Sequence, residues 1–168
     1  MTKSILVTGG ARSGKSAIAE RLALDLGPCP IYIATAEAHD EEMAARIAAH
    51  QARRGSEWTT YSAPLELVEA LGATDGTGPR LVDCLTLWLS NMMLAGQDWQ
   101  TGAQLLADAL GRQTAPVILV TNEVGAGIVP ENALARAFRD AAGLLNQSVA
   151  AVSQEVYLAV AGIPMKMK

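Results

Sequence analysis

The sequence has few cysteines and no long apolar run. It contains two cysteines, Cys29 and Cys84, and no C-x-x-C pair, so it predicts neither a disulfide scaffold nor a thiolate zinc site. Two reduced thiols are typical of a cytoplasmic protein. No apolar stretch reaches the roughly 18 to 20 residues that a membrane span requires, and the N-terminal apolar run has the context of a strand rather than of a signal sequence. We therefore expect a cytoplasmic protein without a membrane span.

The sequence also lacks an excess of basic residues. Its 168 residues carry a formal net charge of -4, whereas a domain that binds nucleic acid normally has a basic surface, so we expect no nucleic-acid partner. Hydrophobic residues make up 50% of the chain and charged residues 18%, which is enough apolar material to bury a core around a central sheet. We expect residues 1–168 to form a single domain.

A glycine-rich motif follows the first apolar run. The residues that match G-x-x-x-x-G-K-[ST] are Gly9, Gly10, Ala11, Arg12, Ser13, Gly14, Lys15 and Ser16. Gly9 and Gly14 allow backbone N–H groups to turn inward, Lys15 supplies a charge for the β- and γ-phosphates, and Ser16 offers a hydroxyl to Mg²⁺. A strand at residues 5–8 and a helical pattern after the motif provide the context that a P-loop requires. The motif indicates a nucleotide but not a reaction.

The rest of the chain alternates between strand and helix patterns. Apolar runs predict strands at residues 5–8, 31–35, 80–84, 116–121 and 155–161, and periodicity predicts helices at residues 15–26, 40–54, 64–71, 85–93, 101–112 and 131–153. Gly162, Ile163 and Pro164 are expected to end the last strand before a short basic tail. Trp58 either packs against neighbouring structure or stacks on a base. The order favours an α/β fold of the P-loop NTPase type, a mostly parallel central sheet with helices on both faces.

The helix predicted at residues 40–54 places a histidine among cations. Arg46, His50 and Arg53 share one face, next to an apolar edge formed by Met43 and Ile47. The two guanidinium groups favour the neutral, nucleophilic form of the imidazole and could also hold phosphates. Taken alone, a histidine on a surface helix is more often merely solvated, so both interpretations stay open at this point.

Two strand ends complete the candidate site. Asp83 ends a short apolar strand, which is the position of a Walker B carboxylate on a strand beside the P-loop, although such an Asp can also cap the next helix. Residues 122–130 follow the most apolar strand and contain polar residues and glycines. Since ligands of open α/β sheets collect at the carboxyl ends of strands, we expect this loop to face the site. It lacks N-K-x-D, so a GTPase base-recognition loop is not predicted.

Several stretches together resemble one family. They are residues 5–16 (I-L-V-T-G-G-A-R-S-G-K-S), 32–35, 42–50 (E-M-A-A-R-I-A-A-H), 83–91, 120–132 (V-T-N-E-V-G-A-G-I-V-P-E-N) and 155–168. These stretches are similar to the adenosylcobinamide kinase/adenosylcobinamide-phosphate guanylyltransferases of cobalamin biosynthesis. The combination of R-I-x-x-H with T-N-E-V-G-x-G-I-V-P is far more specific than the P-loop.

The resemblance implies a bifunctional enzyme. It would phosphorylate the aminopropanol hydroxyl of adenosylcobinamide with ATP or GTP, then transfer GMP from GTP to adenosylcobinamide phosphate, releasing pyrophosphate and forming adenosylcobinamide-GDP. In the family the second reaction passes through a GMP-histidine intermediate. The family's usual assembly is a homotrimer in which the histidine-bearing helix moves when nucleotide binds.

The resemblance also implies roles for individual residues. His50 would carry GMP, since Ala49 stands where some members have a second histidine and His39 precedes the helix. Lys15 would act in catalysis, and Ser16 and Asp83 would hold Mg²⁺. The implied nucleotide contacts are residues Gly9 to Ser16, Ala34, Thr35, Ala36, Gln51, Ala52, Arg53, Arg54 and Asp83. Two alternatives remain: a simple small-molecule kinase with His50 as a surface residue, and a nucleotide-gated regulator without chemistry.

Overall fold

A seven-stranded sheet forms the centre of the molecule in the computed structural model, which describes residues 3–168. Its strands are β1 (Ser4–Gly9), β2 (Ile31–Ala34), β3 (Thr59–Ser62), β4 (Arg80–Asp83), β5 (Val117–Asn122), β6 (Glu155–Val160) and β7 (Ile163–Lys166). Their spatial order is β3-β2-β4-β5-β1-β6-β7, and every neighbouring pair is parallel except β6 and β7. The expected mostly parallel α/β sheet is confirmed.

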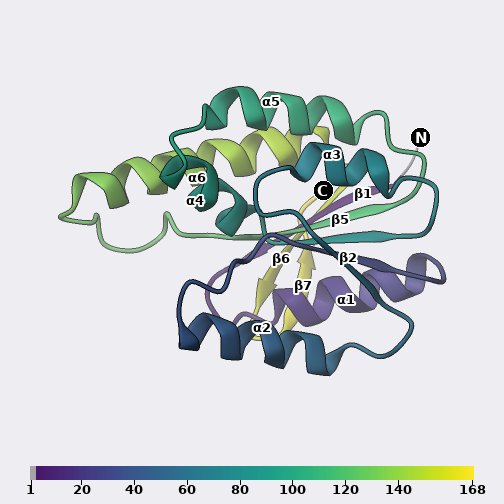
Figure 1. The fold of residues 1–168 in the computed structure, drawn as a ribbon. Coiled ribbons are helices and arrows are strands. Elements are labelled where there is room, and N and C mark those ends of the chain that lie inside the picture. Colours follow the sequence, from purple (N-terminus) through teal and green to yellow (C-terminus); the bar gives the residue numbers. More distant parts are fainter. Residues whose placement is uncertain (1–2) are drawn as a thin grey trace.

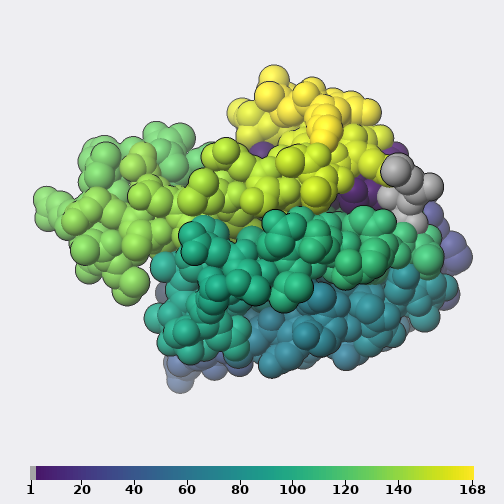
Figure 2. Space-filling view, turned by 90° about the horizontal axis from the view of Figure 1, so that it is seen from above, coloured from purple at the N-terminus to yellow at the C-terminus, as the bar shows by residue number. Residues whose placement is uncertain are grey.

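Helices cover both faces of this sheet (Figure 1). They are α1 (Lys15–Leu26), α2 (Glu41–Arg53), α3 (Leu67–Ala73), α4 (Leu85–Leu94), α5 (Trp99–Leu110) and α6 (Ala133–Val152). In the view of Figure 1, α1 and α2 lie below the sheet and the other helices above it. Seen from above, α5 and α6 form the outer layer, and the chain around residues 123–135 projects beyond the body (Figure 2).

The two apolar layers follow from the alternation of side chains along each strand. Leu6 of β1 joins the core under α3 to α6, whereas its neighbours Ile5 and Val7 join the core under α1. Because both faces of β1 are covered, the strand has no polar face. Helix α2 differs from the others, since every one of its residues is at least partly exposed to solvent.

Two edges of the sheet differ from the sequence-based expectation. Residues 59–62, which receive no assignment from the sequence, form β3 beside β2, and all four are exposed. The expected tail after residue 162 instead forms β7, because Ala161 (φ 51°) and Gly162 (φ 79°) make a tight turn that returns the chain antiparallel to β6. β3 lacks the apolar alternation by which strands are recognised, and β7 follows Gly162 and contains Pro164, both of which normally signal the end of a strand.

The order of the strands changes direction at β1, because β2 to β5 lie on one side of it and β6 and β7 lie on the other. Ligands of open α/β sheets bind outside the carboxyl ends of the strands at such a point. The P-loop follows β1 and therefore lies there. The topology corrects one expectation: Asp83 does not end a strand beside β1, because β5 lies between β4 and β1.

Candidate active site

The P-loop has the backbone that its glycines were expected to permit. Gly14 precedes α1 with a φ of 89°, and a Cβ atom there would lie 2.8 Å from the Cα of Gly162. A Cβ atom on Gly9 would lie 2.6 Å from the Oγ of Ser13 and 2.7 Å from the carbonyl oxygen of Ala159. Both positions therefore exclude any larger residue without movement of the backbone.

Lys15 folds back over the P-loop. Its Nζ donates a hydrogen bond of 2.8 Å to the carbonyl oxygen of Gly10, and its side chain is buried. Burial lowers the pKa of the Lys15 ammonium, while nearby Cys84 and Asp83 oppose that shift. A carbonyl oxygen is a weaker partner for an ammonium than a phosphate oxygen is. An entering phosphate would therefore meet the Lys15 ammonium already positioned at the pocket wall.

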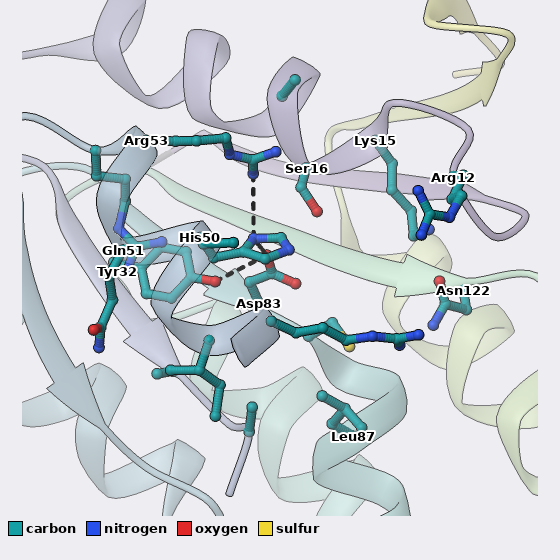
Figure 3. A pocket seen from close by; sticks show the side chains of 18 of the residues that line it. Arg12, Lys15, Ser16, Tyr32, His50, Gln51, Arg53, Asp83, Leu87 and Asn122 are labelled. Atoms are coloured by element: carbon teal, nitrogen blue, oxygen red, sulfur yellow. Dashed lines mark hydrogen bonds and ion pairs between the residues drawn. The ribbon is translucent and has the colours of Figure 1, made fainter. Parts of the chain in front are cut away.

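His50 of α2 faces the P-loop side of the molecule and lies near both a cation and a carboxylate (Figure 3). Its Nδ1 is 3.2 Å from Nη2 of Arg53 and 3.9 Å from Oδ2 of Asp83. The flanking cation Arg53 was expected from the helical spacing, whereas the carboxylate was not. The other expected cation, Arg46, forms an exposed ion pair of 2.9 Å with Glu42.

Asp83 is held by a residue of the neighbouring strand β2. The hydroxyl of Tyr32 on β2 donates a hydrogen bond of 3.0 Å to Asp83 Oδ2 (Figure 3). Burial and the adjacent carboxylate raise the pKa of Tyr32, so its hydroxyl stays a donor. Below this pair, Thr35 Oγ1 donates to the carbonyl oxygen of Cys84 at 2.7 Å and accepts from the N–H of Cys84 at 2.8 Å. The carboxylate therefore has a fixed position at the carboxyl end of β4.

A stack of three side chains closes one end of the site. The guanidinium of Arg54 lies 3.4 Å from the centroid of the Tyr32 ring, which suits a cation–π contact. Trp58 meets the same ring edge-on, with centroids 6.3 Å apart at 78°. Of the two alternatives for Trp58, the structure shows the packing contact.

Residues of the P-loop, β2, α2 and β4 line a cavity of about 690 Å³, within the range typical of small-molecule sites. The candidate residues that line it are Ala11, Arg12, Ser13, Gly14, Lys15, Ser16, Ala34, Ala36, His50, Gln51, Arg53, Arg54 and Asp83. Four candidates lie outside the lining: Gly9, Gly10, Thr35 and Ala52. Thr35 instead supports the cavity floor through Cys84.

Sequence reasoning missed several lining residues. They include Ala17, Tyr32, Ala49, Cys84 and Leu87. Tyr32 sits in an apolar run that is buried on both faces, so the sequence offers no periodic signal for the face that its hydroxyl takes. Asn122, the first residue of the loop expected to face the site, does line the cavity (Figure 3).

Comparison with known proteins assigns the chain to a family. The family described as "Cobinamide kinase / cobinamide phosphate guanyltransferase" matches residues 5–167. The chain belongs to this family. The predicted family and the predicted bifunctional kinase and guanylyltransferase of cobalamin biosynthesis are therefore confirmed. The simple kinase and the regulator without chemistry are both ruled out as complete descriptions.

Two relatives are similar to the chain over almost its whole length. "Bifunctional adenosylcobalamin biosynthesis protein CobP" of Pseudomonas aeruginosa is 46% identical over 166 residues, covering 97% of this chain and 96% of the relative. "Bifunctional adenosylcobalamin biosynthesis protein CobU" of Salmonella typhimurium is 44% identical over 180 residues, covering 98% and 99% respectively.

Solved structures support the fold alone. An ATPase from the type III secretion system of pathogenic bacteria has a TM-score of 0.61 at 10% identity, covering 98% of this chain and 56% of the other. A protein of Pyrococcus horikoshii OT3 has a TM-score of 0.56 at 11% identity, covering 99% and 86%. The expected P-loop NTPase-like fold is thus confirmed.

Residues 3–168 contain no group of three or more His, Cys, Asp or Glu side chains placed to hold a metal ion. Within the same residues, no helix has the length and apolar character to cross a bilayer.

Proposed function

We propose that this cobinamide kinase/guanyltransferase carries out both of its reactions in the single cavity between the P-loop and α2. GTP or ATP would place its β- and γ-phosphates in the P-loop, with the Lys15 ammonium as the counter-charge. The observation that carries the proposal is the placement of His50 in the same cavity, 3.9 Å from Asp83 at the edge of the sheet. A nucleophile at that position can reach the phosphate next to those held by the loop.

In the proposed GMP transfer, His50 forms a covalent bond with the nucleotide. An imidazole nitrogen attacks the α-phosphorus of GTP, a phosphorus–nitrogen bond forms, and pyrophosphate leaves as the bond to its bridging oxygen breaks. A phosphate oxygen of adenosylcobinamide phosphate then attacks the same phosphorus. The phosphorus–nitrogen bond breaks, and adenosylcobinamide-GDP and free His50 result.

Charges around His50 favour this chemistry. The Asp83 carboxylate, near Nδ1, stabilises the positive charge that develops on the ring when its other nitrogen bonds to phosphorus. Arg53, at 3.2 Å from Nδ1, also contacts Glu20 Oε1 at 3.1 Å, so its guanidinium has an anionic partner before nucleotide arrives. We infer that Arg53 moves from both Glu20 and His50 Nδ1 to a phosphate oxygen when nucleotide binds, so that Nδ1 can carry the ring proton and the other nitrogen is free to attack.

Ser16 and Asp83 have the oxygen donors that Mg²⁺ prefers, and both line the cavity. The contacts of Asp83 with Tyr32 and His50 both use Oδ2, so Oδ1 is the oxygen that would face a cation. A single carboxylate suits Mg²⁺, which takes its remaining ligands from substrate phosphates and water. When bound, the ion would neutralise charge on the phosphates during transfer.

We also propose a homotrimer in the cytoplasm, as the family resemblance implies. The sheet ends in β7, whose Ile163 and Met165 are exposed, and an exposed apolar edge of this kind is a surface that subunits can cover. Cys29 and Cys84 are both free thiols, which is consistent with a reducing compartment. Light scattering on the purified protein measures the assembly directly.

The test of the proposed intermediate uses α-labelled GTP. We expect base-stable, acid-labile label on the protein, and we expect His50→Ala to abolish both the label and adenosylcobinamide-GDP formation. Adenosylcobinamide phosphate formation from ATP should largely survive, because direct phosphoryl transfer needs positioning, Lys15 and Mg²⁺. His39→Ala is the matched control, since His39 is 69% exposed and contacts Glu37 outside the cavity.

Two outcomes would contradict the proposal. Formation of adenosylcobinamide-GDP by folded His50→Ala protein would exclude the covalent step. Equal loss of both reactions in that variant would instead assign His50 to nucleotide binding in general.

A further inference from the structure

A second hollow lies between the end of α4 and the start of α6. It has a volume of about 370 Å³ and is lined by Ser90, Met93, Leu94, Asn132, Leu134, Ala135 and Phe138. Each of these side chains is uncharged. We refer to this hollow, together with the exposed Ile128 and Val129 of the segment that leads to Asn132, as the α4–α6 groove.

The groove is unusually apolar for an exposed surface. Leu94 is 73% exposed, Ile128 96% and Leu134 62%. The helical pattern of α6 predicts that Leu134 shares the apolar face of Leu145 and Val149, which are buried. The structure shows instead that the first turns of α6 project beyond the sheet (Figures 1 and 2), so Leu134 is left exposed whereas Phe138 packs against the core. Exposed apolar surface of this kind marks a binding site.

Two chain segments join the groove to the active-site cavity. Helix α4 carries Leu87 in the wall of the cavity and Leu94 in the groove, about 10 Å apart at 1.5 Å per residue. The other segment begins at Asn122 in the cavity wall and reaches Asn132 in the groove. Its second residue contacts the P-loop, because the N–H of Glu123 donates a hydrogen bond of 2.9 Å to the carbonyl oxygen of Gly9.

The segment that leads to the groove starts at the P-loop end of the cavity, where Asn122 lies. Figure 3 shows Asn122 on the same side as Arg12 and Lys15 of the P-loop, and Tyr32 and Gln51 on the opposite side. The acceptor of a γ-phosphoryl group must approach from the P-loop end, in line with the bond that breaks. A large acceptor would therefore rest on the surface next to Asn122.

The size and chemistry of the acceptor fit this surface. A cavity of about 690 Å³ suits one nucleotide, and a corrin macrocycle with its side arms is larger than a nucleotide, so it has to lie outside. The periphery of a corrin ring carries methyl groups and neutral amides, which require apolar contacts and uncharged polar groups. The other rim, α2, begins instead with Glu41 and Glu42, and its Arg46 is exposed.

We propose that the α4–α6 groove, with Ile128 and Val129, binds the corrin ring of the cobinamide substrate while the aminopropanol arm extends past Asn122 to the P-loop. This proposal rests on the proposed function only in that the kinase step takes place at the P-loop. It assigns a macrocycle-binding role to residues outside the nucleotide cavity.

The test is a pair of groove variants, Leu134→Ser and Ile128→Ser. Both side chains are mostly exposed, so the substitutions should leave folding intact. We expect the KM for adenosylcobinamide in the ATP-dependent kinase reaction to rise roughly tenfold or more, the effect of losing one buried aliphatic contact. Labelling by α-labelled GTP without corrinoid, and the KM for ATP, should not change. Leu105→Ser on α5, where Leu105 is 50% exposed, is the matched control.

An unchanged KM for adenosylcobinamide in both variants would overturn the proposal. A smaller assembly by light scattering, accompanied by loss of labelling, would also overturn it and would assign the groove to contact between copies of the chain. Failure of the unmodified protein to become labelled bears on His50 alone, because the KM for adenosylcobinamide is measured in the kinase reaction.

Discussion

Replacing Gly14 by alanine should disable the P-loop, and replacing Gly162 by alanine should not. Both glycines have positive φ values, 89° and 79°, so alanine at either position pays a similar backbone cost. That cost is about 1–2 kcal/mol. The two positions differ in the space around them. A Cβ atom on Gly14 would lie 2.8 Å from the Cα of Gly162, whereas a Cβ atom on Gly162 has no neighbour within 4 Å in the described structure.

The close contact at Gly14 involves backbone on both sides, so it cannot be relieved by rotating a side chain. The P-loop and the β6–β7 turn would have to separate, which also strains the 2.8 Å hydrogen bond from the N–H of Gly162 to the carbonyl oxygen of Ser13. Overpacking of this kind costs a further 1–3 kcal/mol, roughly. We therefore expect Gly14→Ala to lose about 2–5 kcal/mol of stability in total and Gly162→Ala about 1–2 kcal/mol.

The functional difference should be larger than the difference in stability. Displacement of the loop at Gly14 moves the backbone N–H groups at the start of α1, which are the groups that would hold phosphate. We expect GTP affinity, measured by titration calorimetry, to fall roughly tenfold or more for Gly14→Ala, a change of about 1.4 kcal/mol. Gly162→Ala should bind GTP almost normally. Equal losses of GTP affinity in the two folded variants would refute the reasoning, because only their shared backbone cost would then matter.

Three further substitutions test other parts of the structure. Lys15→Ala should lower the rate of both reactions roughly a hundredfold or more, because the ammonium compensates the charge of the β- and γ-phosphates. Normal turnover by this variant would contradict the assignment of residues 9–16 as a phosphate-binding loop. Asp83→Asn should keep the fold but raise the Mg²⁺ concentration for half-maximal rate by about tenfold or more, the effect of losing more than 1.4 kcal/mol; a normal Mg²⁺ titration would leave Asp83 a structural role only. Asp75→Asn should lower the free energy of unfolding by about 3–5 kcal/mol, because it leaves the fully buried Arg80 without its 2.7 Å carboxylate partner. Burial raises the pKa of Asp75, but hydrogen bonds from the N–H groups of Ala115 and Thr114 and from Arg80 outweigh it and depress the pKa. The stabilisation by Asp75 should therefore be complete above about pH 4 and lost as the pH falls through the lower folded-state pKa. Urea unfolding at several pH values should show no such loss for Asp75→Asn, and the control is Asp98→Asn, which changes an exposed helix cap.

Some parts of the fold could be predicted from the sequence because their causes are local. Apolar runs that are buried on both faces identify β1, β2, β4 and β5, and turn residues such as Gly27 and Pro28 separate them from helices. The P-loop was recognised because its glycines and Lys15 act within eight consecutive residues. The helical spacing also placed Arg53 beside His50, since residues three apart share a face.

Other parts depend on contacts between distant residues. The insertion of β5 between β1 and β4, and the pairing of β3 with β2, are choices of strand order that no single segment specifies. Similarly, β7 exists because the turn at Gly162 returns the chain to β6 and packs against Gly14.

The identity of the candidate nucleophile and the arrangement around it were decided at different levels. The sequence by itself determined the fold class, the P-loop and a helix on which His50 follows Arg46 and precedes Arg53, because these depend on residue type and spacing. Only the tertiary structure decided that Asp83 lies 3.9 Å from His50 and that Tyr32 holds the same oxygen. It also decided that Leu134 is exposed, since the sheet ends before α6 does. Periodicity shows which residues share a face of a helix, but the neighbouring elements determine whether that face is covered.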